Sequence, residues 1–159
     1  MKDLKLEINL KLAQLDELSD DDQQLIKLAK QATAHSFSPY SHFKVGAAAR
    51  LANGKTFIGA NQENAAFPSG LCAERTALYA AQANCPAEPV TTLAIAARNS
   101  RGFMKLPISP CGGCRQVMIQ VEDRYQQPMR ILLYGADGVY CFDSAKDLMP
   151  FHFVDANMR

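Results

Sequence analysis

The chain has 159 residues, a length that fits one domain, since domains commonly take roughly 100–200 residues. Apolar residues make up 48% of it and charged residues 21%, an ordinary globular mixture with enough apolar area for one core. The net charge is +1 without a long Lys/Arg run, and no apolar run approaches the ~18 residues of a membrane span. We therefore expect a single domain over residues 1–159, with neither nucleic acid nor a membrane as its partner.

The first ten residues and the cysteines indicate the compartment. Charges interrupt the N-terminal stretch throughout, so it does not resemble the apolar core of a signal peptide. An odd number of cysteines argues against a disulfide framework and favours metal or catalytic roles in a reducing compartment. We expect a cytoplasmic protein. Its five cysteines are Cys72, Cys85, Cys111, Cys114 and Cys141.

The N-terminal part predicts a strand followed by a helix. Apolar residues alternate with charged or polar ones over residues 4–12, which is the period of a strand with one buried face. We expect residues 1–18 to form an N-terminal extension with an extra strand. Ser19 is a good helix N-cap, and the three aspartates that follow it suit the positive end of a helix dipole. A helix is predicted over residues 19–36.

A hairpin and a second helix follow. Strands are predicted at Val45–Leu51 and Thr56–Ala60, because the Asn-Gly pair between them is a strong hairpin signal. Residues 61–70 form a loop. The segment Cys72–Asn84 is rich in Ala, Leu, Glu and Arg and predicts a helix.

The C-terminal half continues the alternation of strands and helices. Strands are predicted at Thr91–Ala97, Met129–Tyr134 and Val139–Phe142, with a helix at Gly112–Gln127 and a short helix beginning near Ser144. Such alternation predicts an α/β domain in three layers, α/β/α. We expect a mixed sheet of about five strands with helices on both faces, besides the extra N-terminal strand.

Two motifs could carry chemistry. Cys72 begins Cys-Ala-Glu-Arg, and Cys111 and Cys114 form Cys-Gly-Gly-Cys after Pro110. Each motif opens a predicted helix, where the dipole favours thiolates, the form of cysteine that binds metal. Three protein ligands leave a fourth zinc position for water, as in a catalytic site. Glu74 is well placed to face that water, and Arg75 could balance the charge of the thiolates.

Four ordered blocks of sequence resemble the small homotetrameric zinc-dependent cytidine deaminases. The resemblance runs from about residue 38 to residue 153 and leaves out the first twenty residues. The blocks are Ser-Pro-Tyr-Ser-His-Phe-Lys-Val-Gly-Ala-Ala at 38–48, Asn-Gln-Glu-Asn-Ala-Ala at 61–66, Cys-Ala-Glu-Arg-Thr-Ala at 72–77 and Ser-Pro-Cys-Gly-Gly-Cys-Arg-Gln-Val at 109–117.

The resemblance implies a role for each matching position. It implies one zinc ion per chain on Cys72, Cys111 and Cys114, with Arg75 donating to the thiolates. Glu74 would activate the zinc-bound water and then carry protons to N3 and to the 4-amino group as ammonia leaves. The substrate would be cytidine or 2′-deoxycytidine, in a pyrimidine salvage role. The implied substrate-binding residues are Phe43, Asn61, Glu63, the backbone near Ala65, and Phe153 of a neighbouring subunit in a homotetramer.

Other interpretations of these residues stay open at the level of sequence. The Cys-x-x-Cys motif alone could be a redox pair, and Cys85 or Cys141 could complete a structural zinc site. Asn61 and Glu63 could be ordinary polar loop residues, and Phe153 could be core packing. A zinc-binding module without catalysis, or a deaminase of a related substrate such as blasticidin S or another nucleobase compound, is the alternative function.

Overall fold

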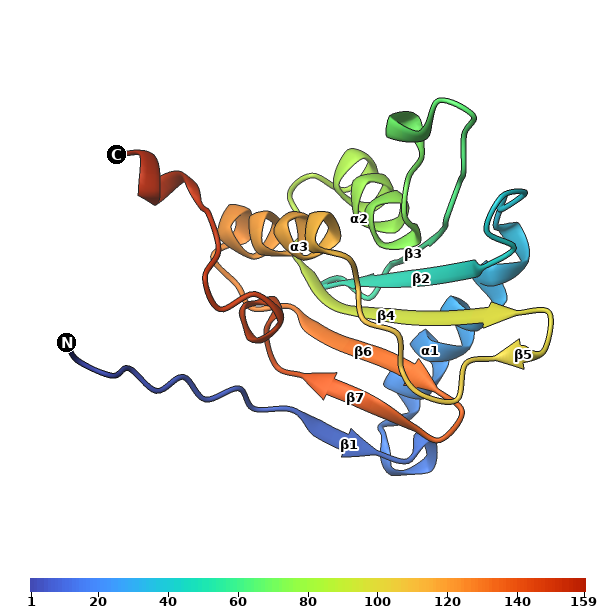
Figure 1. Cartoon of the computed structure of the whole chain (residues 1–159), viewed down its shortest axis with the longest axis horizontal. Coiled ribbons are helices and arrows are strands. Elements are labelled where there is room, and N and C mark those ends of the chain that lie inside the picture. The colour runs from blue at the N-terminus through green and yellow to red at the C-terminus, as the bar shows by residue number, and fades with distance from the viewer.

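A computed structural model describes all 159 residues and shows one seven-stranded sheet (Figure 1). The strand order is β1-β7-β6-β4-β2-β3, and β5 pairs with β4 beside this path. Only β4 and β6 are parallel neighbours, and α3 makes the crossover between them. The strands are β1 Lys11–Ala13, β2 Lys44–Leu51, β3 Thr56–Ala60, β4 Val90–Asn99, β5 Gly102–Phe103, β6 Arg130–Gly135 and β7 Gly138–Phe142.

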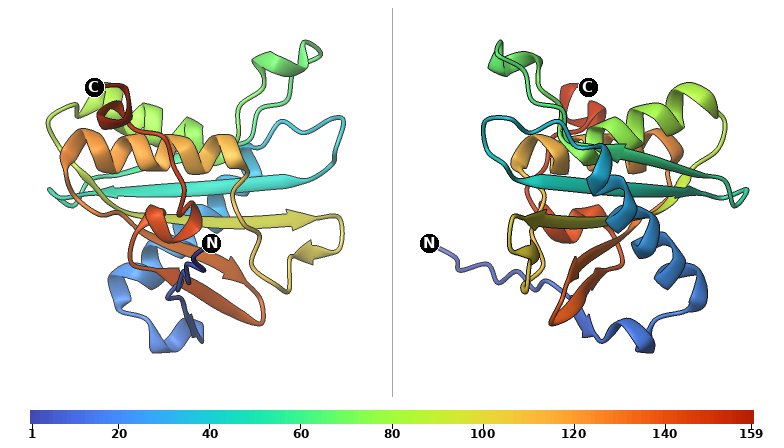
Figure 2. Two further views of the ribbon diagram at one scale, coloured as in Figure 1. Left: turned by 60° about the vertical axis from the view of Figure 1, so that its left-hand side comes forward. Right: turned by 90° about the vertical axis from the view of Figure 1, so that its right-hand side faces the viewer.

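Three α-helices cover the two faces of the sheet. The helix α1, Asp20–Ala32, lies on one face, while α2, Ala73–Asn84, and α3, Gly112–Tyr125, lie on the other (Figures 1 and 2). Ser19 caps α1 by accepting a hydrogen bond from the backbone N–H of Asp22. Short 3₁₀ turns occupy Leu15–Glu17, Thr33–His35, Phe67–Ser69, Ala145–Leu148 and Asp155–Met158.

The alternation of side chains along the strands divides the core into two layers. In β4, Leu93 and Ile95 pack with α2 and α3, whereas Ala94 and Ala96 pack with α1. Every second residue of a strand points to the same face, so a sheet covered on both sides needs apolar residues at nearly every position. The predicted α/β/α layering and the mixed sheet are confirmed.

Two glycines let the helices approach the sheet closely. A Cβ atom at Gly59 in β3 would lie 2.4 Å from the backbone nitrogen of Ala77 in α2. A Cβ atom at Gly46 in β2 would lie 2.2 Å from the carbonyl oxygen of Ala29 in α1. The position of α2, which carries one of the two cysteine motifs, therefore depends on the missing side chain of Gly59.

The predicted N-terminal strand is the main correction. Only Lys11–Ala13 forms a strand, paired with residues 139–141 of β7, and residues 1–10 belong to no helix or strand. The reason is that β7 ends at Phe142, after which the chain turns into the 3₁₀ turn at Ala145–Leu148. The earlier residues of the extension therefore have no neighbouring strand within the chain.

The remaining predicted elements lie close to their expected bounds. The predicted helix over 19–36 is α-helical only to Ala32 and then tightens into a 3₁₀ turn, and α3 ends at Tyr125 because Gln126 adopts a left-handed conformation. The predicted short helix near Ser144 is a 3₁₀ turn. The strand β5, which has only two residues, was not predicted. None of the helices is both long and apolar enough to span a membrane.

Candidate zinc and substrate site

The two cysteine motifs meet at the N-termini of α2 and α3. Cys72 is the N-cap residue of α2, Cys111 is the N-cap residue of α3, and Cys114 lies in the first turn of α3. The three sulfur atoms all lie within 4.8 Å of one another. Both helices lie on the same face of the sheet with these ends together, so residues 39 positions apart in the chain form one cluster (Figure 1).

The spacing of the sulfur atoms fits a zinc ion. The Sγ atoms of Cys111 and Cys114 are 3.5 Å apart, and those of Cys72 and Cys111 are 3.9 Å apart. Thiolates at about 2.3 Å from a tetrahedral zinc ion lie roughly 3.8 Å from one another. Neither Cys85 nor Cys141 belongs to the cluster. Cys85 is the C-cap residue at the opposite end of α2 from Cys72, so a fourth thiolate is not available.

Glu74 lies beside the cluster in a small cavity. The cavity has a volume of about 190 Å³ and is lined by Val45, Asn61, Cys72, Ala73, Glu74, Ile95, Ile108, Ser109 and Cys111. Only 5% of Glu74 is exposed. Burial raises the pKa of its carboxyl group, and the nearby charge of Cys72 acts in the same direction. A buried carboxyl group with a raised pKa therefore shares one cavity with two of the three cysteines.

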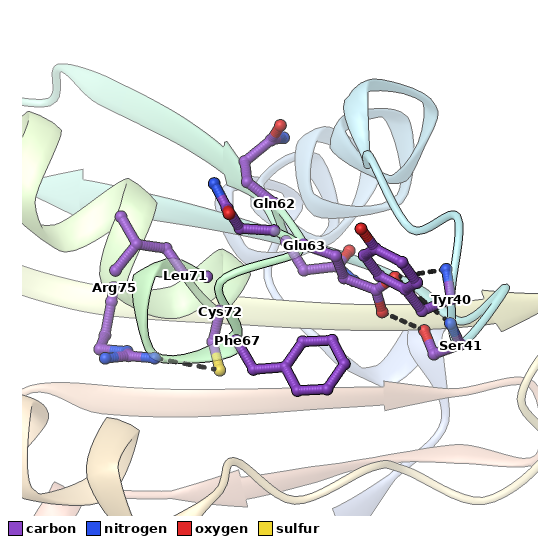
Figure 3. Close-up of a pocket in the computed structure, with 11 residues that line it drawn as sticks. Tyr40, Ser41, Gln62, Glu63, Phe67, Leu71, Cys72 and Arg75 are labelled. Carbon is purple, nitrogen blue, oxygen red and sulfur yellow. Dashed lines mark hydrogen bonds between the residues drawn. The ribbon is translucent and has the colours of Figure 1, made fainter.

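Arg75 places a cation beside the sulfur atoms. Its Nη2 atom lies 3.7 Å from Sγ of Cys72 (Figure 3). Hydrogen bonds from Cys114, Arg75 and Cys111 lower the pKa of Cys72 to about 5 against the opposing effect of burial. The hydrogen bond to Cys72 and burial raise the pKa of Cys114. The guanidinium group therefore favours negative charge on the cluster.

A wider groove of about 590 Å³ opens beside the small cavity and shares Cys72 and Asn61 with it. Figure 3 shows Tyr40 and Ser41 on one side of this groove and the 62–72 segment, with Phe67, on the other. Glu63 accepts hydrogen bonds from the backbone N–H groups of Tyr40 and Ser41 and from the Ser41 hydroxyl. The hydrogen bond from Ser41 is the main cause that lowers the pKa of Glu63.

Asn61 stands between the groove and the small cavity and holds the surrounding loop together. Its Oδ1 atom accepts hydrogen bonds from the Ser36 hydroxyl at 2.6 Å and from the backbone N–H of Val45 at 2.8 Å. Its amide group donates to the carbonyl oxygen of Phe43 at 2.9 Å. These contacts orient the segment that carries Phe43, which is half-buried and lines neither the groove nor the cavity.

The last two predicted substrate residues, Ala65 and Phe153, line neither the groove nor the small cavity. Ala65 is exposed in the loop before the 3₁₀ turn at residues 67–69. Phe153 lies in the C-terminal tail with 56% of its surface exposed, and it lines neither space described above. Its carbonyl oxygen accepts a hydrogen bond from Gln116 of α3 at 2.7 Å. The ring of Phe153 is therefore not part of its own chain's core.

Arg115 is a contact residue that the sequence analysis did not single out. Its Nε atom donates to the carbonyl oxygen of Pro110 at 2.9 Å, and its Nη1 atom donates to that of Leu148 at 2.8 Å. It therefore joins the segment before Cys111 to the end of the 3₁₀ turn at Ala145–Leu148, where the C-terminal tail, residues 149–159, begins. The only signal in the sequence is its place directly after Cys114 in a block that matches the family pattern.

Comparisons with known proteins agree with this geometry. Residues 19–126 match the sequence model of the cytidine and deoxycytidylate deaminase zinc-binding region, a span that includes both cysteine motifs. The cytidine deaminase of Halalkalibacterium halodurans is 44% identical over 139 residues, which cover 87% of this chain and 98% of that protein.

Solved structures of two cytidine deaminases have the same fold. That from Burkholderia pseudomallei is 40% identical with a TM-score of 0.70 and covers 82% of this chain and 97% of that one. That from Mycobacterium tuberculosis is 29% identical with a TM-score of 0.66 and covers 86% and 99%. The chain belongs to the zinc-binding cytidine and deoxycytidylate deaminase family. Its metal is zinc, and this disfavours the redox interpretation of the Cys-x-x-Cys motif.

Proposed function

We propose that this chain hydrolyses cytidine and 2′-deoxycytidine to uridine and 2′-deoxyuridine with release of ammonia. The observation that carries the proposal is the meeting of three cysteines with a buried glutamate in one cavity, beside a groove that bears Asn61 and Glu63. The relatives named above are called cytidine deaminases, and none of the features described here favours blasticidin S or another nucleobase compound as the substrate.

Cys72, Cys111 and Cys114 hold the metal in this proposal, and Arg75 offsets the negative charge of the three thiolates. When bound, zinc supplies a Lewis acid that makes a water molecule nucleophilic near neutral pH. Glu74 would take a proton from the attacking water and deliver it to N3 of the cytosine ring, while the water oxygen forms a bond to C4. It would then carry the remaining proton of that oxygen to the 4-amino group, so that the C4–N bond breaks, ammonia leaves and the oxygen stays as the C4 carbonyl group. Its burial suits a carboxyl group that must be protonated and deprotonated in one turnover.

Asn61 and Glu63 bind the ribose hydroxyl groups in this proposal. Both side chains accept hydrogen bonds from residues of the 36–45 segment, and hydroxyl groups of a nucleoside would compete for the same acceptor oxygens. The backbone near Ala65 contacts the base, and Phe43 packs beside the nucleoside. A carboxylate at the groove also disfavours a phosphate group, so nucleosides should be better substrates than nucleotides.

Assembly completes the site in this proposal. Phe153 is more than half exposed and lies outside its own chain's cavity, so its ring is free to stack on the base held by a neighbouring subunit. We infer a homotetramer with shared active sites, each chain being a single domain. All five cysteines are free thiols, which suits a cytoplasmic enzyme of pyrimidine salvage.

The test follows the loss of cytidine absorbance on incubation with the protein. Turnover should disappear with a chelator and return with Zn²⁺. Glu74→Gln should lower the rate by at least about 10²–10⁴-fold, since the carboxyl group serves more than one proton transfer. Its zinc content should not change. Glu88→Gln, beyond the far end of α2, is the matched control and should keep the rate of the unmodified protein.

Two results would contradict the proposal. A zinc-loaded protein that turned over neither cytidine nor 2′-deoxycytidine would exclude the function. A clear preference for CMP or dCMP over the nucleosides would exclude the ribose assignment of Glu63 while leaving the deaminase chemistry intact.

A further inference from the structure

The N-terminal arm, defined as residues 1–10, projects from the body of the protein as an extended segment (Figures 1 and 2). It lies outside the family match, which begins at residue 19. Its apolar side chains alternate with charged or polar ones but are unburied. Leu4 is 87% exposed, Leu6 55% and Ile8 49%. A one-faced strand pattern without a partner is a feature that the proposed enzyme activity does not use.

The arm lacks backbone partners within its own chain. It continues directly into β1, which pairs with β7 only through residues 11–13. No backbone hydrogen bond outside the regular elements begins or ends in residues 1–10. A segment with strand periodicity and a free row of N–H and C=O groups is a template for pairing with another strand.

We propose that the N-terminal arms of two copies of this chain pair as antiparallel strands about a two-fold axis at Leu6. Such an interface is isologous, because each arm presents the same residues to its partner. In this register Leu6 faces its own counterpart and Leu4 faces Ile8, which places apolar residues together on one side. Lys5 faces Glu7 on the other side, and the two-fold axis repeats this opposite-charge pair.

The charges on the arm select this register. Lys5 and Glu7 lie on the same side of the arm, where they form an exposed ion pair at 2.8 Å within the single chain. An axis at Lys5 or at Glu7 would bring like charges directly together. In the register at Leu6, Lys2 faces Leu10 at the end of the arm, while Leu4, Leu6 and Ile8 all face apolar residues. An axis at Leu4 would place Leu6 opposite Lys2 and leave Ile8 with no opposite residue, and an axis at Ile8 would place Lys5 opposite Lys11. A shift of the register by one residue would place a polar residue opposite each of Leu4, Leu6 and Ile8.

The attachment of the arm to the sheet supports pairing with a second copy. An isolated two-stranded ribbon is only marginally stable in water. Here each strand of the ribbon is the continuation of β1, which is already paired with β7 as the edge of the sheet. Pairing of the arms therefore extends two existing sheet edges and satisfies backbone groups that one chain leaves free.

The test is hydrogen exchange of the arm amides in the full-length zinc-loaded protein, measured by mass spectrometry on the N-terminal peptide. We expect slow exchange that becomes fast on dilution. Lys5→Glu and Glu7→Lys each replace two attractive pairs by two repulsive ones, so each should weaken pairing by about tenfold. The double exchange K5E/E7K should restore protection. Asp3→Lys is the matched control, because Asp3 faces the uncharged Asn9 and its reversal should leave protection nearly unchanged.

A mixture of the two single variants distinguishes pairing between two copies of the chain from binding of the arm to any other partner. A chain with glutamate at 5 and 7 complements a chain with lysine at both positions, so mixing should restore protection that neither variant has alone. Three results would overturn the proposal. The arm amides of the unmodified protein could exchange as fast as in a free peptide at every concentration, or their protection could be independent of concentration and of these charges. The third result is that neither the double exchange nor the mixture restores the protection of the arm amides. Cytidine turnover should be the same in all variants, which keeps this test independent of the proposed function.

Discussion

Replacing Gly59 by alanine should damage the candidate zinc site from the opposite side of α2. The new Cβ atom would lie 2.4 Å from the backbone nitrogen of Ala77 and 2.5 Å from the carbonyl oxygen of Ala73. The first distance is about 1 Å short of the 3.4 Å at which ordinary contact begins. Both neighbours are backbone atoms of α2, so relief requires the whole helix to move away from β3.

Displacement of α2 should lower both the stability of the protein and the rate of turnover. Overpacking of a well-filled core typically costs about 1–3 kcal/mol of stability. The same movement carries Cys72, at the N-cap of α2, and Glu74, in its first turn, away from Cys111 and Cys114. A misplacement of about 1 Å at a catalytic centre can lower the rate by roughly 10²-fold. We expect Gly59→Ala to show both losses, together with weaker retention of zinc.

Gly46→Ala is the matched control because it creates the same conflict on the other face. Its Cβ atom would lie 2.2 Å from the carbonyl oxygen of Ala29 and 2.6 Å from the nitrogen of Thr33, against α1. Urea unfolding should show a similar loss of stability, whereas zinc content and cytidine turnover should fall far less. Equal losses of turnover in the two variants, or an unchanged stability of Gly59→Ala, would refute the reasoning.

Substitutions at four further positions test other contacts. Asp22 forms ion pairs with Arg50 and Arg130, which lower the pKa of its carboxyl group against the opposing effect of burial. These ion pairs should stabilise the fold above pH 3.8 and lose this effect as the pH falls below that value. Asp22→Asn should therefore flatten that part of the acid unfolding curve. Glu122→Ala should cost about 1–3 kcal/mol in urea unfolding, because it orphans donors at residues 129, 144 and 145, whereas Glu122→Gln should cost less. Arg75→Gln should lower kcat with zinc still bound, as metal analysis would show. Arg115→Met should loosen the C-terminal tail, measured as faster proteolysis, and weaken zinc retention.

The sequence predicted the elements whose signals are local. Hairpin chemistry located β2 and β3, and capping by Ser19 located the start of α1. The alternation over residues 4–12 failed as a strand because periodicity reports which side chains share a face and says nothing of whether a neighbouring strand is present. In the folded chain β7 ends at Phe142. The end of β7 depends on the C-terminal segment, so the N-terminal residues carry no signal for it.

The candidate site was likewise predicted from the sequence only in part. Ligand chemistry and helix N-termini were enough to select Cys72, Cys111 and Cys114, because these properties belong to short motifs. The closeness of the two motifs depends on how α2 and α3 pack on one sheet face, which only the fold provides. The hydrogen bonds of Asn61 were likewise unpredictable, because its partners Ser36, Phe43 and Val45 are 16 to 25 residues away in the chain and meet it only in the folded structure.

The two ends of the chain show why one sequence leaves part of the site undetermined. Phe151 is 88% exposed and Phe153 56%, and the apolar residues of the N-terminal arm are about as open. Exposed apolar side chains in such numbers indicate surfaces that another molecule covers. For the arm, opposite charges one residue on each side of Leu6 favour a second copy and a particular register. For the tail, the hydrogen bond from Gln116 fixes the backbone of residue 153 against α3 and leaves the residue 56% exposed. In the proposed homotetramer, α3, which carries Cys114 in its first turn, would therefore hold this aromatic ring at a neighbour's site.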